Sequence, residues 1–150
     1  MKKFAFKLAA LLKLRERHRD LCLQLLAQAM RRDEELLALR KQAETDRASQ
    51  FDEIRDLTDV GEVDVDGAAT RRFYAGQLIG DIGGIERQRM LVAHQIAACR
   101  QKLILADQGV KALEKLQEKQ LADFRFVQDR REERELEECF RTAEIGRAHV

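Results

Sequence analysis

The sequence predicts an all-α protein in which two long helices form an antiparallel coiled-coil hairpin. Leu, Ala, Glu, Lys and Arg make up 82 of the 150 residues, a bias that is typical of long helices. The chain contains no proline, which would break the interior of a helix. Apolar residues recur at steps of three and four through two long segments, and one short interruption separates them. We therefore expect residues 1–143 to form a single hairpin.

The first predicted helix covers residues 4–57. Its apolar residues recur mostly three and four positions apart, which is the signature of one buried helix face. Two successive steps of four, ending at Ala29, predict a local stutter in the packing. The apolar positions are Leu11, Leu14, Leu21, Leu25, Ala29, Leu36, Leu39, Ala43, Ile54 and Leu57.

Residues 59–67 interrupt the pattern with two glycines, three aspartates and three valines. All three residue types are poor helix formers, and Gly with Asp marks a turn. The segment is too short to form a sheet, so we interpret it as the tip of the hairpin.

The second predicted helix covers residues 68–138 and carries an almost unbroken heptad repeat. A seam of this length favours a coiled coil over a globular bundle. After Val127 the seam positions become polar, so we expect the far end to be loose or to contact something else. One row of the seam is Leu78, Ile85, Val92, Cys99, Ala106, Leu113, Gln120 and Val127; the other is Ile82, Arg89, Ile96, Leu103, Val110, Gln117 and Phe124.

A short turn forces the two helices to pair antiparallel. Residue numbers that face each other should then add up to about 126–130, which places Phe4 and Phe6 near Phe124 and Phe126. The charges agree with this pairing, because residues 1–19 carry a net charge of +6 and residues 129–138 a net charge of −3.

The composition also limits the function. Seven Phe, one Tyr and no Trp are few aromatic residues for an enzyme core, and the phosphate-loop, zinc-protease and nucleophile-elbow motifs are absent. The near balance of 28 basic and 27 acidic residues argues against a dedicated nucleic-acid binder. We expect no catalytic activity, no cofactor, no metal, no small-molecule substrate and no nucleic-acid partner.

The histidines and cysteines do not form a ligand set. His18 is expected on the first seam and His94 beside the second. Only His18 has another potential ligand three or four positions away, Cys22, and two ligands do not complete a zinc site. Cys22, Cys99 and Cys139 are odd in number and lack C-x-x-C spacing, as in a reducing compartment. The adjacent carboxylates at 132–133 and 137–138 are interpreted as ordinary charges on a solvated helix.

Gly76, Gly80 and Gly84 recur every fourth residue, with Gly83 beside them. Each glycine inside a helix costs about 1 kcal/mol relative to alanine. The stripe is either a weakly helical stretch after the turn or a face that another backbone can approach closely. Tyr74, the single tyrosine, lies beside it and is a docking candidate.

Neither end of the chain changes this prediction. Lys7 and Lys13 interrupt the early apolar run, so we expect no signal peptide, and no stretch is long enough for a membrane span. Residues 144–150 resemble the translation of a sequencing adapter. We expect them to be a non-native tail that replaces the natural C-terminus, and we leave them out of the prediction.

The opening of the chain resembles that of the flagellar FliJ protein family. Residues 3–8 read KFAFKL and residues 11–17 read LLKLRER, which is similar to the family's basic F-x-F-x-L followed by L-L-x-L-R-E. The spacing of Tyr74, Leu78, Ile82 and Ile85 is also similar. The resemblance extends over nearly the whole chain up to Ala143.

This resemblance implies a non-enzymatic component of bacterial flagellar type III protein export, cytoplasmic and peripheral to the inner membrane at the flagellar base. It implies a monomeric stalk that enters the ring of the export ATPase FliI, contacts the cytoplasmic domain of the export gate protein FlhA, and escorts export chaperones. The ATPase contacts carried over are Phe4, Phe6, Lys7, Leu11 and Arg15. The gate contacts carried over are Tyr74, Gln77, Asp81, Gly84 and Gln88, although family members can have larger apolar residues at the positions of Gln77 and Asp81.

Two other interpretations stay open at the level of sequence. One is a structural coiled-coil scaffold that dimerises and has no export role. The other is the equivalent stalk of an injectisome.

Overall fold

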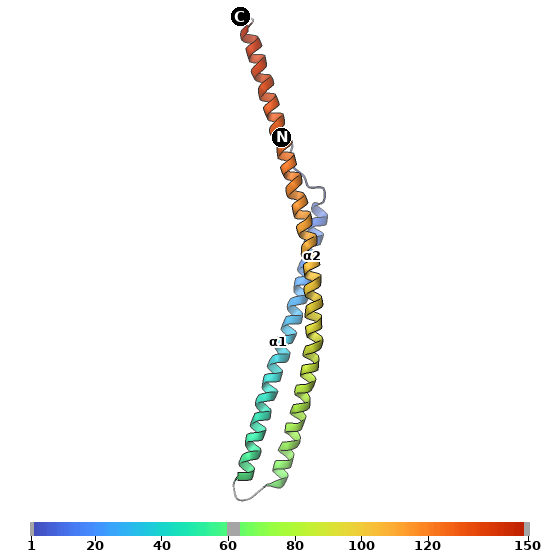
Figure 1. Ribbon diagram of the computed structural model, residues 1–150, viewed down its shortest axis with the longest axis vertical. Helices are drawn as coiled ribbons and strands as arrows, with labels where there is room; N and C mark the ends of the chain where they lie inside the picture. Colours follow the sequence, from blue (N-terminus) through green and yellow to red (C-terminus); the bar gives the residue numbers. More distant parts are fainter. Residues whose placement is uncertain (1, 60–63, 149–150) are drawn as a thin grey trace. The chain divides into compact units, whose positions relative to one another are not determined.

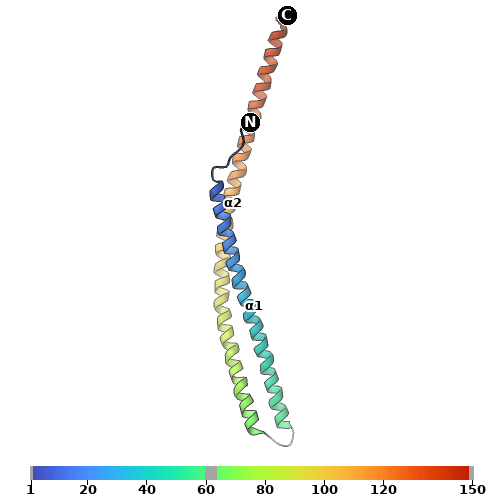
Figure 2. The same cartoon turned by 180° about the vertical axis from the view of Figure 1, so that it is seen from behind.

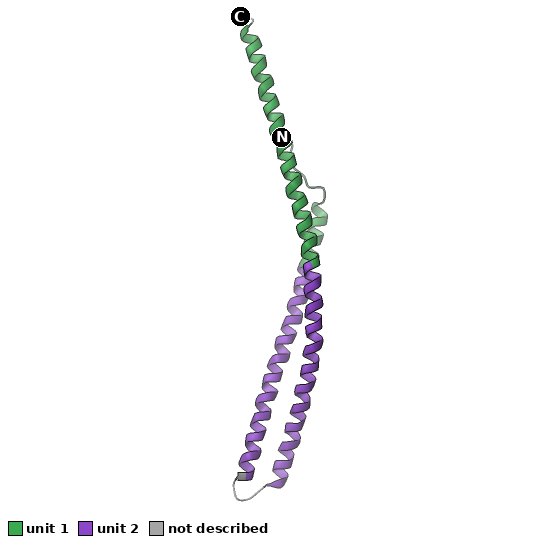
Figure 3. Ribbon diagram, in the orientation of Figure 1, with its two compact units in different colours: residues 1–19, 105–150 green, residues 20–104 purple. Residues whose placement is uncertain are grey.

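The computed structural model describes residues 2–59 and 64–148. Two helices, α1 (Ala9–Asp59) and α2 (Val65–Ala148), make up nearly all of them, and no strand occurs in these two ranges. The chain divides into two compact units, one formed by residues 20–104 and the other by residues 1–19 with 105–150 (Figure 3). The predicted all-α hairpin is confirmed.

In the unit of residues 20–104, the two helices lie side by side and run antiparallel (Figures 1 and 2). The seam on α2 follows the predicted heptad: Leu78 and Val92 are buried, and Ile82, Ile85 and Ile96 are half-buried. The buried side chains of α1 in this unit are Cys22, Leu36, Ala43 and Ile54. On α2, two more side chains are buried at positions that precede the predicted heptad, Ala68 and Ala75.

Ion pairs between the helices set the register in this unit. Arg89 is a polar residue at a seam position, and its Nε and Nη2 donate to the two carboxylate oxygens of Asp33 at 3.0 and 3.5 Å. The hydrogen bond with Asp33 is the main reason that the pKa of Arg89 lies above its ordinary value. Two further pairs join Arg40 to Glu86 and Arg71 to Glu53. The residue numbers of these pairs add up to 122–126, a slightly lower register than predicted.

In the unit of residues 1–19 and 105–150, the start of α1 packs against α2. Leu12 meets a seam that includes the buried Ala106 and Val110. Near its end, the α2 seam shifts by one residue, because Leu121 and Gln128 are half-buried while Gln120 and Val127 are exposed. From residue 129 to residue 148 every side chain is exposed, so the seam ends where the sequence predicted.

The predicted seam of the first helix is wrong at several positions. Leu14, Leu21, Leu25 and Leu39 are more than half exposed, and Leu11 is 37% exposed. The residues that are buried instead include Leu12 and Cys22. Adjacent leucines at 11–12, 25–26 and 36–37 explain the error, because a run of neighbouring apolar residues fits more than one helical register.

The helix boundaries also differ from the prediction. α1 begins at Ala9 rather than at residue 4, because residues 2–6 are not helical. α2 begins at Val65, so residues 65–67 belong to the helix and not to the tip. Asp64 explains this start: its Oδ1 accepts a hydrogen bond from the Gly67 amide at 3.0 Å, as an N-cap does. α1 ends at Asp59 rather than at residue 57, so this residue too belongs to a helix and not to the tip. Residues 60–63 of the predicted tip lie outside the described residues.

At its other end α2 continues to Ala148, beyond the predicted end at residue 138. In the ranges that the structure covers, neither helix has a stretch that is long and apolar enough to cross a membrane.

Candidate functional site

The two predicted contact sets fall in different units of the chain. Phe4, Phe6, Lys7, Leu11 and Arg15 belong to the unit of residues 1–19 and 105–150, shown in green in Figure 3. Tyr74, Gln77, Asp81, Gly84 and Gln88 belong to the unit of residues 20–104, shown in purple. Each set is therefore built by a different part of the hairpin, and we describe them one at a time.

The aromatic part of the first set anchors the chain start to α2. The rings of Phe4 and Phe124 lie with their centroids 5.7 Å apart at 52°, a distance and tilt common for stabilising aromatic pairs. Phe6 is half-buried, and its carbonyl accepts a hydrogen bond from the Ala9 amide at 3.2 Å. The predicted proximity of Phe4 to Phe124 is confirmed, whereas Phe126 is 62% exposed and lies under the guanidinium of Arg130.

The basic part of the first set spans the start of α1, because Lys7 precedes the helix and Arg15 lies within it. Lys7, Leu11 and Arg15 are spaced four residues apart and are exposed. Arg15 runs alongside Gly109 of α2, where an added methyl group would lie 3.9 Å from its Cδ. The first turn of α1 contains no acidic residue, so the positive end of the helix dipole adds to these charges. The result is a positively charged surface flanked by phenylalanines.

The acidic residues that face this basic segment are not those that the sequence predicted. Arg19 lies 4.0 Å from Asp107, which also accepts from Lys111 at 2.9 Å. The hydrogen bond and the charge of Asp107 raise the pKa of Lys111 above its ordinary value. Residues 129–138 are exposed and come after the part of α2 that packs against α1. The ring contact places Phe4 beside Phe124, five residues before this acidic segment begins.

The second set forms one stripe along α2. Its residues are spaced alternately three and four apart, which keeps them on one side of the helix. Tyr74 is 43% exposed, Gly84 is half-buried, and the remaining members are exposed. Asp81, Gly84 and Gln88 line a groove between the two helices.

The opposite wall of this groove comes from α1 and contains residues that the sequence analysis did not select. Leu39, Gln42 and Asp46 line it, and the Gln42 amide donates to Asp46 Oδ1 at 3.0 Å. Leu39 was expected in the seam, but it is 54% exposed because Leu36 and Ala43 take the buried positions. The antiparallel register could have identified these residues, since it places the region around residue 42 opposite the region around residue 84.

The glycines at positions 76, 80, 83 and 84 of α2 are not required by the packing of the hairpin. A methyl group added at Gly76 or Gly80 would meet no atom within 4 Å. At Gly83 and Gly84 it would meet only the flexible end of Arg87, 3.9 Å away. α2 is helical through all four positions.

The remaining chemically active side chains do not form a site. His18 and His94 are both exposed, so the predicted place of His18 on the first seam is wrong. Cys22 is buried, Cys99 is half-buried and Cys139 is exposed. No group of three potential metal ligands occurs among residues 2–59 and 64–148.

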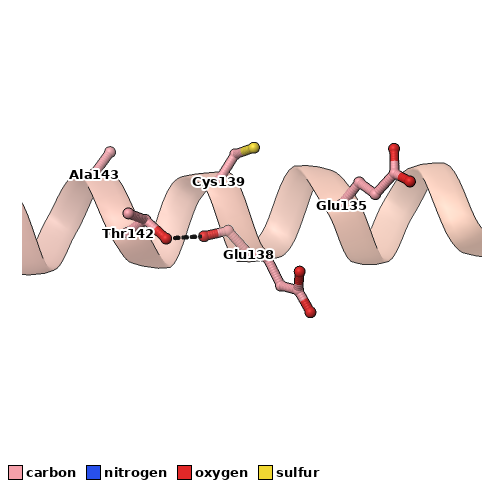
Figure 4. A pocket seen from close by; sticks show the side chains of 5 residues that line it. All are labelled: Glu135, Glu138, Cys139, Thr142 and Ala143. Carbon is pink, nitrogen blue, oxygen red and sulfur yellow. Dashed lines mark hydrogen bonds between the residues drawn. The ribbon is translucent and has the colours of Figure 1, made fainter.

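A shallow depression near the end of α2 is lined by Glu135, Glu138, Cys139, Thr142 and Ala143 (Figure 4). All five belong to a single helix, and Thr142 donates to the Glu138 carbonyl at 2.8 Å. Side chains of one exposed helix cannot enclose a substrate, so we do not interpret this depression as a binding site.

Comparison with known proteins gives one result. The model of a family described as "Flagellar FliJ protein" matches residues 4–144. No curated protein and no solved structure matches the chain.

Proposed function

Because the chain belongs to the flagellar FliJ protein family and is thereby an export-related coiled-coil protein of the flagellum, we propose that it is a stalk-like subunit with two separate docking surfaces. One surface serves the export ATPase ring and the other serves the export gate. In this role the hairpin also escorts export chaperones, and it catalyses no reaction of its own.

The observation that carries this proposal is the separation of the two surfaces. The basic, phenylalanine-flanked surface of Phe4, Phe6, Lys7, Leu11 and Arg15 lies in the unit of residues 1–19 and 105–150. The α2 stripe and its groove lie in the unit of residues 20–104. Because each surface belongs to a different unit, a substitution in one surface should leave the other contact unchanged, and the two contacts can be tested separately.

For the ATPase contact, the expected partner surface is acidic with apolar pockets. Lys7 and Arg15 are exposed and would meet carboxylates, while Leu11 is a partly exposed anchor between them. Charged residues at the rim of an interface mainly raise the association rate, and they do so less at high salt. The contact should therefore weaken as the ionic strength rises.

The test is stimulation of the purified flagellar export ATPase by the full chain. We expect the double variant Lys7→Glu and Arg15→Glu to lose most of the stimulation while it keeps its helical circular dichroism. The matched control is Lys41→Glu, an exposed basic residue of α1 in the other unit, which should stimulate like the unchanged chain. Undiminished stimulation by the double variant would refute the ATPase contact.

For the gate contact, Tyr74 and Leu39 are the anchors. They are exposed by 43% and 54%, and aromatic and large apolar side chains dominate most interface energies. Leu39 lines the groove together with Asp81 and Gln88, so a partner that fills the groove should touch both helices.

We expect Tyr74→Ala and Leu39→Ala each to reduce capture of the cytoplasmic domain of the export gate protein. The control Thr45→Ala removes the end of an exposed α1 side chain outside the groove and should bind normally. If both variants bind like the unchanged chain, the gate does not use this groove.

A further inference from the structure

The outward-facing side of α2 in the unit of residues 20–104 is unusual for a solvated helix. We call it the outer face; it comprises the heptad positions on the side of α2 away from the seam. Of these, Gly83 and Gly84 are half-buried, and Gly84 also lines the edge of the groove. Its members are Phe73, Gly76, Gln77, Gly80, Gly83, Gly84, Arg87, Met90, Leu91, His94, Ala97, Ala98, Gln101 and Ile104. Phe73, Met90, Leu91 and Ile104 are 70%, 64%, 66% and 49% exposed.

The neighbouring helix provides an internal comparison. The equivalent outward positions of α1 between residues 28 and 56 number 13, and seven of them are charged. The outer face has 14 positions and one charged residue, Arg87. Both helices belong to the same unit and are equally exposed to solvent on their outward sides. The general composition of coiled coils therefore does not account for the low number of charged residues on the outer face. An apolar surface of this extent marks an interaction site.

The outer face is complementary to itself when two copies run antiparallel. A two-fold axis between Met90 and Leu91 brings each of these residues against its own counterpart. The small residues of one half then face the larger residues of the other half: Gly76 meets Ile104 of the second copy. Gly83 and Gly84 meet Ala97 and Ala98 of the second copy, where two helices without bulky side chains can approach closely.

Charge agrees with the same register. When two identical helices pair antiparallel about a two-fold axis, each edge of one helix lies against the same edge of the other. This brings Asp81 of one copy beside Lys102 of the second copy. Both side chains are exposed, and neither forms an ion pair in the described parts of the chain. The axis generates this attraction twice. Glu86, on the other edge, meets Ala93 of the second copy and encounters no like charge.

From these observations we infer that α2 pairs with α2 of a second copy through the outer face, antiparallel and centred between Met90 and Leu91. The paired region spans about 46 Å of each helix. It forms a four-helix assembly in which both helices of each hairpin keep their own seam. The inference concerns the free chain and does not depend on the export role proposed above. It differs from the monomer that the family resemblance implied, and the mass of the chain in solution decides between the two.

The first test is the mass of the full chain in solution, measured by light scattering over a dilution series. We expect concentrated protein to approach twice the chain mass of 17.3 kDa. Leu91→Glu places two carboxylates together at the axis and should give a monomer with unchanged helical circular dichroism. The control Ala38→Glu adds the same charge to an exposed outward position of α1 and should stay dimeric.

A monomeric unchanged chain at all concentrations, or a dimeric Leu91→Glu variant, overturns the inference. If the outer face binds a different protein instead of a second copy, the unchanged chain should be monomeric at all concentrations.

The second test examines the register. Asp81→Lys and Lys102→Asp should each weaken dimerisation roughly tenfold, since each turns two attractions into repulsions. The two substitutions together should restore it, because the pair re-forms with its signs exchanged. Absence of this rescue overturns the proposed register.

A cysteine at position 90 provides an independent readout. In a Cys139→Ser background, Met90→Cys brings two thiols together at the axis and should form an intermolecular disulfide under mild oxidation. Gln101→Cys lies on the same face but meets Gly80, and it should crosslink much less. Equal crosslinking at the two positions contradicts an axis at residue 90.

Discussion

At the scale of single residues, the clearest contrast is between two leucines three positions apart on α1. Leu36 is 1% exposed within the seam, whereas Leu39 is 54% exposed at the edge of the groove. Both fit the apolar periodicity of the sequence, which cannot separate them because Leu37 lies between and shifts the apparent register. Only the pairing with α2 decides which leucine is buried.

This contrast predicts two different stability effects. Leu36→Ala should lower the free energy of unfolding by about 2–5 kcal/mol, because it leaves a cavity in a packed seam. Leu39→Ala should change it by less than about 0.5 kcal/mol, as is usual for surface substitutions. Denaturant unfolding followed by circular dichroism measures both. Equal losses would mean that the assignment of the seam on α1 is wrong.

At the scale of elements, the two helices differ in how well the sequence predicted them. The α2 seam from Leu78 to Gln117 lies where the heptad indicated, because its seven-residue repeat continues without a stutter over several turns and so favours one register. The ends were predicted less well. A helix end depends on capping and on packing partners, neither of which a periodic pattern records.

The start of α2 makes this point testable. Asp64 accepts from the Gly67 amide at 3.0 Å, and its carbonyl accepts from the Ala68 amide at 3.0 Å. Asp64→Ala should destabilise the protein by about 0.5–2 kcal/mol through loss of the cap. Asp64→Asn keeps an acceptor at the same place and should stay close to the unchanged protein in thermal unfolding. If both variants lose the same stability, the charge of Asp64 matters rather than its capping bond.

The last part of α2 offers a second prediction for this scale. Residues 105–128 contribute buried and half-buried side chains to the contact with α1, whereas residues 129–143 contribute none. Helical stability in proteins comes mostly from such packing. Backbone amides of residues 129–143 should therefore exchange with solvent faster than those of residues 105–128 in hydrogen-exchange mass spectrometry. Similar protection of the two segments would mean that the terminal segment has a packing partner in solution.

At the scale of the whole molecule, the nearly neutral net charge hides an uneven distribution. The unit of residues 1–19 and 105–150 has 16 basic and 12 acidic residues, a net charge of +4. The unit of residues 20–104 has 12 basic and 15 acidic residues, a net charge of −3. The sequence predicted the two candidate contact sets as short lists of positions. It did not predict that they belong to units of opposite charge, because a heptad repeat that runs through the whole of α2 does not mark where one unit ends and the next begins.

This division predicts that the two proposed contacts can be separated by truncation. A fragment of residues 20–104 keeps both helices of one unit, the ion pairs Asp33–Arg89, Arg40–Glu86 and Arg71–Glu53, and buried side chains from Cys22 to Val92. Removing residues 1–19 alone would instead strip α1 from the seam at Ala106 and Val110 and leave that apolar surface exposed. The fragment is therefore the cleaner variant.

We expect the fragment to be helical and to unfold cooperatively in a circular dichroism melt. It should capture the gate domain, because it contains the complete groove, and it should fail to stimulate the export ATPase, because it lacks Phe4 to Arg15. Adding the Leu39→Ala substitution to the fragment should then remove gate capture as well. A folded fragment that stimulates the ATPase would move the ATPase contact into the unit of residues 20–104. A folded fragment without gate capture would show that the gate needs residues outside the groove.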